Sequence, residues 1–371
     1  MADLLFKLFS IDKRSMRVWR RYRVRKVCLM VPLFVTMTVI NNVGLALDWL
    51  LYPSFKKQAI RRPVFVVSLP RTGTTNLLHA LTAPGMPFTS MRLWEILLAP
   101  SIVQKRLIRW CWRRVPHRFQ CWIRRVDERL FESLNSVHHA SLFLPEEDDL
   151  LLLWSFSTAF LGLFYPETEV MRAHFRFDEA ISEEQKARIM KRYRRLVQRH
   201  LYAIGAGENV RFLSKNPAMA AKVGAIAAHF PGGKAVVIER PPNNVLPSTM
   251  LLVDSQVTLA TDVAMSERET QAIFDVLAHF RRNLQLQLAD RQVIPHTVLR
   301  FSDLVQDRKA SINALLGWLE SNAAYSPQDQ KQVHTSKKSY TPLTDEELES
   351  VLKEPWPVWP PESLLTVAPS N

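Results

Sequence analysis

One stretch in the first quarter of the chain constrains the fold more than any other. It reads Val64-Phe-Val-Val-Ser-Leu-Pro-Arg-Thr-Gly-Thr-Thr75, and the apolar residues after it repeat with the period of a helix. Residues 64–69 are mostly β-branched, aromatic or aliphatic, which predicts a strand buried in a parallel sheet. A proline ends this strand, Gly73 permits a tight turn, and the two threonines can cap a helix that begins at Asn76.

A strand, a glycine turn and a helix N-terminus in succession can form a cradle for an anion, because backbone N–H groups and the positive end of the helix dipole meet there. The spacing is close to that of the Walker A loop, GxxxxGK[ST]. Ser68 replaces the first glycine of that motif, Thr74 replaces its lysine, and Arg71 is the only cation in the loop. The loop therefore predicts a site for a phosphate-like group, not ordinary ATP hydrolysis; the alternative is a glycine turn of any α/β protein.

A second candidate phosphate site follows the strand predicted over residues 234–239. Arg240 comes at the end of this strand, and Ser248 lies eight residues further on, in the first turn of the next predicted helix. An arginine fork beside a hydroxyl at the start of a helix is a good site for a phosphate monoester.

The two sites together resemble those of sulfotransferases that use 3′-phosphoadenosine 5′-phosphosulfate (PAPS). The nucleotide loop of that family reads roughly P-[KR]-[ST]-G-[ST]-T, and its members grip the 3′-phosphate with an Arg at a strand end and a Ser eight residues later. Three further runs are similar to its sulfotransferase-3-like members: Leu213-Ser-Lys-Asn-Pro-Ala218, Ala228-His-Phe-Pro231 and Val298-Leu-Arg-Phe-Ser-Asp-Leu304. The resemblance covers about residues 60–320.

The resemblance implies an α/β fold with a P-loop-like parallel sheet flanked by helices, and two predicted βα units support it. A helical insertion at roughly 85–210 would form the acceptor side. PAPS would be the co-substrate, and its sulfuryl group would pass in line to a hydroxyl or amine of an acceptor whose class the sequence does not specify. The 5′-phosphosulfate would be held by the backbone of Thr72, Gly73, Thr74 and Thr75, with Arg71 neutralising the leaving charge, and the 3′-phosphate by Arg240 and Ser248.

Such a transfer needs a general base for the acceptor's proton. Glu95 lies among apolar neighbours, whose desolvating effect predicts a raised pKa, and family members with a Glu after the loop helix imply this role for it. His138 and His139 are the second choice. No further cluster of ligands accompanies these histidines, and the three cysteines lack CxxC spacing, so we predict no metal site.

Two departures from the family pattern bear on activity: Ser68 in the loop, and Pro241-Pro-Asn-Asn244 in place of the common Asp-Pro-x-x. Two other functions therefore stay open. A P-loop kinase or nucleotidase needs a metal-binding Asp after a strand, where this chain has Glu239-Arg240. A catalytically dead, nucleotide-binding membrane scaffold would bind without turnover.

The remaining segments are predicted from periodicity and composition. Residues 182–203 predict a long amphipathic helix, opened by a capping pattern. Residues 105–125 predict a basic helix pair on the surface, or a flap that faces a membrane or an acidic substrate. Residues 150–165 predict a buried helix. The chain thus divides into a basic segment, an apolar segment, an α/β domain and a loosely packed Pro-rich extension, at residues 1–26, 27–51, 60–325 and 326–371.

The net charge of +14 suits an anionic partner, and residues 13–26 carry eight of the basic groups. No RNP, zinc-finger or helix-turn-helix motif occurs, so no nucleic acid is predicted. The apolar segment 27–51 can be a single-pass anchor with a cytoplasmic N-terminus, an interfacial segment on acidic lipid, or a helix packed on the domain. We expect membrane contact through residues 13–51, and otherwise a cytoplasmic protein.

Overall fold

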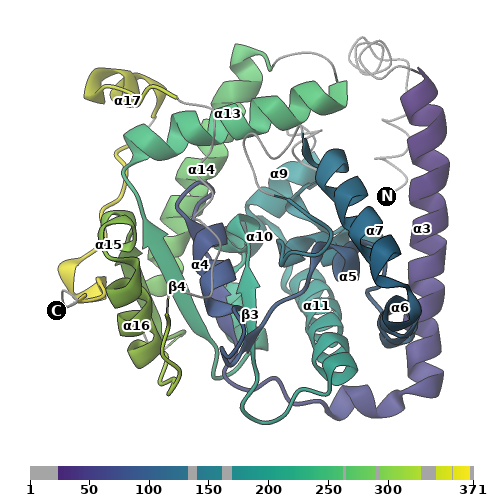
Figure 1. Cartoon of the computed structure of the whole chain (residues 1–371). Helices are drawn as coiled ribbons and strands as arrows, with labels where there is room; N and C mark the ends of the chain where they lie inside the picture. The colour runs from purple at the N-terminus through teal and green to yellow at the C-terminus, as the bar shows by residue number, and fades with distance from the viewer. Residues whose placement is uncertain are drawn as a thin grey trace.

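Five parallel strands form the centre of the molecule, in the order β2-β3-β1-β4-β5 (Figure 1). The structure, a computed structural model, describes residues 24–132, 140–160, 169–261, 265–289, 293–326, 340–352 and 354–367. The strands are β1 (Val64–Val66), β2 (Phe88–Thr89), β3 (Arg211–Lys215), β4 (Lys234–Glu239) and β5 (His296–Arg300). In the central strand, Val66 pairs with Lys215 on one side and Val236 on the other. The predicted α/β fold with a parallel sheet is confirmed.

Helices cover both faces of this sheet and form a further layer beside it (Figure 1). The described helices are α3 (Val24–Leu51), α4 (Thr74–Leu81), α5 (Leu93–Leu97), α6 (Ile102–Arg114), α7 (His117–Leu130), α9 (Glu169–Phe175), α10 (Phe177–Ala180), α11 (Glu183–Ile204), α12 (Val223–His229), α13 (Pro242–Thr261), α14 (Glu267–Leu288), α15 (Phe301–Gln306), α16 (Arg308–Trp318) and α17 (Asp345–Val351). Short 3-10 helices include η2 (Asp148–Ser155) and η4 (Pro217–Ala221).

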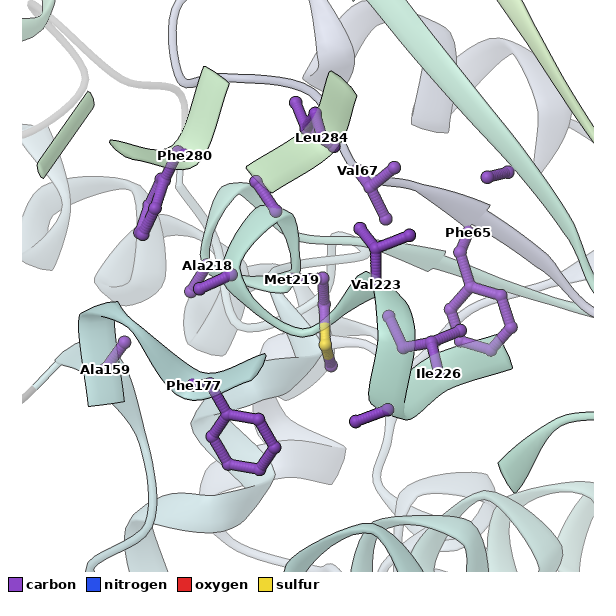
Figure 2. Close-up of a cluster of buried hydrophobic side chains, with 14 of the residues drawn as sticks. Phe65, Val67, Ala159, Phe177, Ala218, Met219, Val223, Ile226, Phe280 and Leu284 are labelled. Carbon is purple, nitrogen blue, oxygen red and sulfur yellow. The ribbon is translucent and has the colours of Figure 1, made fainter. Parts of the chain in front are cut away.

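Alternate residues of β1 point to opposite faces, so each face of the sheet builds its own core. Phe65 and Val67 join buried side chains of α11, α12 and α14. Figure 2 shows these two residues with Met219 of η4 and with side chains of α12 and α14. On the other face, Val64 and Val66 pack against α4 and α16. Burial on both sides explains why the strand reads as a continuous apolar run.

Several predicted elements have different bounds in the structure. β1 ends at Val66, and α4 begins at Thr74, two residues before the predicted start, with Gly73 as its N-cap. The prediction of a buried helix over 150–165 is wrong for the described residues: the 3-10 helix η2 ends at Ser155, and the next residue, Phe156, has a left-handed backbone. The insertion also contributes the short edge strand β2, which the sequence analysis missed. The helix predicted over 182–203 is confirmed as α11.

The C-terminal extension packs on the domain, in contrast to the predicted loose arrangement. Trp359 is buried and its indole N–H donates to Glu239 Oε2 at 2.8 Å. The backbone of Leu365 donates to Val298 O of β5 at 2.7 Å. These contacts join the described parts of the extension to the edge of the sheet.

The apolar segment 27–51 forms most of α3, which lies along the outside of α6 (Figure 1). By length and composition, Pro32–Leu51 could cross a membrane. However, Asn41 and Asp48 of this helix are fully buried against the domain.

Candidate active site

The loop after β1 is shaped by two residues with positive φ. Gly73 has φ 89°, and a Cβ there would lie 3.0 Å from the ring of Phe301. Arg71 has φ 63°, a conformation that residues with a side chain adopt at a cost. The loop leads into α4, whose first-turn N–H groups have no acceptors within the helix. This geometry, at the carboxyl end of the central strand, suits an anion.

Ser68, which stands where a glycine was expected, fastens the loop to the neighbouring strand. Its side chain is fully buried, and its Oγ accepts from the backbone N–H of Ile238 in β4 at 2.5 Å. Thr72 closes the turn by donating to Leu69 O at 2.8 Å. The serine is therefore part of the loop's support and does not fill the cradle.

The structure joins the two predicted phosphate sites. Arg71 Nε donates to Ser248 Oγ at 3.0 Å, and Arg240 Nη1 donates to the backbone oxygen of Arg71 at 2.5 Å. Ser248 is buried in the second turn of α13, not in the first turn as predicted. Burial lowers the pKa of Arg71, and the charge of Arg240 lowers it further. Two partly buried guanidinium groups that repel each other favour an anion between or beside them.

Aromatic side chains enclose Arg240. Its guanidinium lies 4.4 Å from the centre of the Phe301 ring, and it also donates to the hydroxyl of Tyr340. That hydroxyl in turn donates to Asn244 Oδ1 at 3.2 Å. Asn244 belongs to the segment that departs from the family pattern, so this departure supplies the hydrogen-bond acceptor for the Tyr340 hydroxyl. Tyr340 was not predicted as a site residue, because its partners Arg240 and Asn244 lie 100 and 96 residues away in the sequence.

Glu95 is a buried ion-pair partner, and its predicted raised pKa is wrong. Only 2% of its side chain is exposed, and Oε1 accepts from Arg109 at 2.8 Å. Lys105 Nζ and His200 Nδ1 lie 4.0 and 3.8 Å from the same oxygen. Burial alone would raise the pKa of Glu95, but Lys105, His200, the N–H of Arg92 and Arg109 together lower it to about 2. The predictions for His138 and His139 lie outside the described residues.

A second buried ionic cluster, which the sequence analysis missed, lies at the carboxyl end of β3. Lys215 ends this strand and donates to Glu147 Oε1 at 2.8 Å, with Glu146 Oε1 3.8 Å away. Lys222 is paired with Asp149, and both are fully buried. In the described part of the chain, no group of three or more His, Cys, Asp or Glu could hold a metal ion.

Asp148 lies within the same cluster and is closed to solvent. Its Oδ1 accepts from Ser214 Oγ at 2.9 Å, and the hydroxyl of Tyr193 donates to its Oδ2. Burial raises its pKa to about 7, in part against the effect of these two hydrogen bonds. Lys215 lies beside Val66 of β1, so this cluster borders the start of the phosphate loop.

A match to a known protein family agrees with the order of the two phosphate sites and with the fold around them. The model of the sulfotransferase family matches residues 63–324. The chain belongs to the sulfotransferase family. This membership favours sulfuryl transfer over the kinase or nucleotidase alternative. No curated protein matches the sequence significantly.

Two solved sulfotransferases are similar in structure. Sulfotransferase STF1 from Mycobacterium tuberculosis H37Rv superposes with a TM-score of 0.57 at 18% identity, over 81% of this chain and 82% of that one. Sulfotransferase STF9 from Mycobacterium avium gives a TM-score of 0.55 at 18% identity, over 75% of this chain and 68% of that one. At this identity the similarity is one of fold.

Proposed function

We propose that this sulfotransferase moves a sulfuryl group from PAPS to a hydroxyl or amine acceptor. The observation that carries the proposal is the joining of Arg71, Ser248 and Arg240 at the carboxyl ends of β1 and β4. These residues come from two segments about 170 residues apart, and each segment separately suits a phosphate. A nucleotide with both a 5′- and a 3′-phosphate group would use both.

The roles of the side chains follow from their hydrogen bonds. Ser248 Oγ accepts from Arg71, so its own hydrogen is available to an oxygen of the 3′-phosphate. Arg240 would hold the same phosphate as a fork. Arg71 and the N–H groups of Thr72, Gly73, Thr74 and Thr75 would surround the 5′-phosphosulfate.

In the transfer, an acceptor oxygen or nitrogen bonds to sulfur while the bond from sulfur to the 5′-phosphate oxygen breaks. The electron pair stays on that oxygen, and adenosine 3′,5′-bisphosphate leaves. Negative charge therefore grows at the 5′-phosphate, where Arg71 and the N–H groups of the loop stabilise it. The acceptor's proton passes to a general base.

Our choice for this base is Glu147. The Glu147 side chain is 17% exposed, and that of its ion-pair partner Lys215 is 1% exposed. Lys215 ends β3 and lies beside Val66 of β1, directly before the phosphate loop. Glu95 has a pKa of about 2 and its oxygens already bind Arg92 and Arg109, so we assign it a supporting role. His138 and His139 stay alternatives from the sequence.

An assay with PAPS labelled in its sulfuryl group tests these assignments on a panel of hydroxyl and amine acceptors. Glu147→Gln is expected to lower turnover by roughly 10²–10⁴ with nucleotide affinity unchanged. Glu346→Gln, at an exposed carboxylate of α17, is the control. If Glu147→Gln is active while His138→Ala or His139→Ala is dead, the base is that histidine. Nucleotide binding by a parent that labels no acceptor would support the scaffold alternative.

A further inference from the structure

From Pro32 to Leu51 the outer face of α3 is apolar. Between Pro32 and Leu51 the exposed side chains carry no charge. At about 1.5 Å per residue, these 20 residues make a stripe about 30 Å long. The large exposed hydrophobics on it are Leu33, Val35, Val39, Ile40, Val43, Leu47, Trp49, Leu50 and Leu51. An exposed apolar stripe of this size marks an interaction surface.

The inner face of α3 is fastened to the domain by buried polar contacts. Asp48 accepts from the backbone N–H groups of Ile102 and Val103 at 2.9 and 3.1 Å, and so caps α6. It also forms a buried ion pair with Arg199 of α11 at 2.8 Å. Asn41 donates to Leu97 O at 3.0 Å.

These contacts argue against a spanning helix. Crossing a bilayer would separate α3 from α6 and α11, leave Arg199 buried without Asp48, and put Asp48 and two asparagines into hydrocarbon. The helix instead presents its apolar face while it stays on the domain.

The neighbouring helices α6 and α7 supply positive charge and exposed aromatic rings. Figure 1 shows α3, α6 and α7 grouped at one side of the molecule, away from α15 and α16. The exposed basic residues of α6 and α7 are Arg106, Arg113, Arg114, Arg118, Arg124, Arg125 and Arg129. Their exposed large hydrophobics are Leu107, Trp110, Phe119, Trp122 and Leu130. Of the two acidic residues in these helices, Asp127 is buried and only Glu128 is exposed.

We propose that the exposed faces of α3, α6 and α7 form a monotopic membrane-binding surface for anionic lipid, with α3 lying in the plane of the interface. Arginines bind the headgroups, while Trp and Leu side chains enter the acyl boundary, as in interfacial amphipathic helices. The guanidinium of Arg114 lies 3.8 Å from the centre of the Trp110 ring, so these two groups can enter the interface together. The excess of arginine over acidic groups selects an anionic bilayer over a second copy of this basic chain.

Flotation of the full chain with vesicles tests the proposal. We expect binding to phosphatidylcholine vesicles that contain phosphatidylserine, at least tenfold weaker binding to phosphatidylcholine alone, and partial release by high salt. Val39→Asn with Val43→Asn on α3, and Arg118→Glu with Arg125→Glu on α7, are each expected to weaken binding at least tenfold. Val305→Asn is the matched control: this residue is 67% exposed on α15, and Val39 is 57% exposed. Unchanged melting temperatures verify folding.

Three results would overturn the proposal. Binding that none of these variants weakens would mean that the membrane contact lies elsewhere. Protection of an N-terminal tag from protease added outside sealed vesicles would mean that α3 spans the bilayer. A lipid-free dimer that the α3 variants dissociate, with no binding to vesicles, would make the stripe an interface between two copies.

Discussion

The substitution Glu95→Gln distinguishes most clearly whether Glu95 supports the fold or acts in catalysis. The pKa of Glu95 falls from 4.5 to about 2 in the folded protein. At about 1.4 kcal/mol for each pKa unit, its ionised form contributes about 3 kcal/mol to the free energy of unfolding. Removing one partner of a buried ion pair costs a similar roughly 3–5 kcal/mol. Burial also lowers the pKa of Lys105 to about 8, so loss of its proton would limit the cost, and we expect about 3 kcal/mol.

Urea unfolding of both proteins between pH 7 and pH 2 measures this contribution. Because the folded-state pKa is lowered, the contribution is present above about pH 4.5 and disappears as the pH falls toward 2. The gap between parent and Glu95→Gln should therefore be largest near neutral pH and close in acid. Glu128→Gln, at an exposed position of α7, should match the parent. A Glu95→Gln protein as stable as the parent but unable to transfer sulfate would refute the reasoning and restore Glu95 as the base.

Three further substitutions test the site and its support. Arg240→Ala loses a charge-assisted contact worth about 2–5 kcal/mol, so calorimetry should record at least thirtyfold weaker binding of adenosine 3′,5′-bisphosphate. Adenosine 5′-phosphosulfate should be weakened much less, through the lost hydrogen bond from Arg240 to the backbone oxygen of Arg71; equal weakening of both ligands would make the Arg structural. Gly73→Ala should weaken nucleotide binding about tenfold, since φ is 89° and the new Cβ meets Phe301. Gly232→Ala, at φ 73° with open space, is its control and should keep parental affinity. Lys222→Met leaves Asp149 buried without its ion-pair partner and should cost roughly 3–5 kcal/mol in thermal unfolding; a parental melting temperature would contradict this.

Local chemistry made the two candidate phosphate sites recognisable in the sequence. The strand, the glycine turn and the helix start of the first site lie within one short stretch of sequence. Arg240 and Ser248 of the second site lie within another. Their properties depend on backbone geometry that the nearby sequence encodes. The serine that replaces a loop glycine could be recognised from the sequence, but its hydrogen bond with the backbone N–H of Ile238 in β4 could not.

The features that were not predicted depend on contacts between residues far apart in the sequence. Glu95 has apolar neighbours, but Lys105, His200 and Arg109, which lower its pKa, lie 10, 105 and 14 residues away. The partner of Lys215 is 68 residues away. Asp48 interrupts an apolar run in the sequence, yet in the fold it caps α6. The residues that flank each of these side chains in the sequence carry no signal for its distant partner.

One titration tests the central claim, that the two phosphate sites bind one nucleotide. Calorimetry should compare adenosine 3′,5′-bisphosphate with ATP for the full chain without added metal. The joined geometry of Arg71, Ser248 and Arg240 predicts a preference of at least tenfold for the bisphosphate, which alone carries a 3′-phosphate. Tighter binding of ATP, or equal binding of both, would contradict the account.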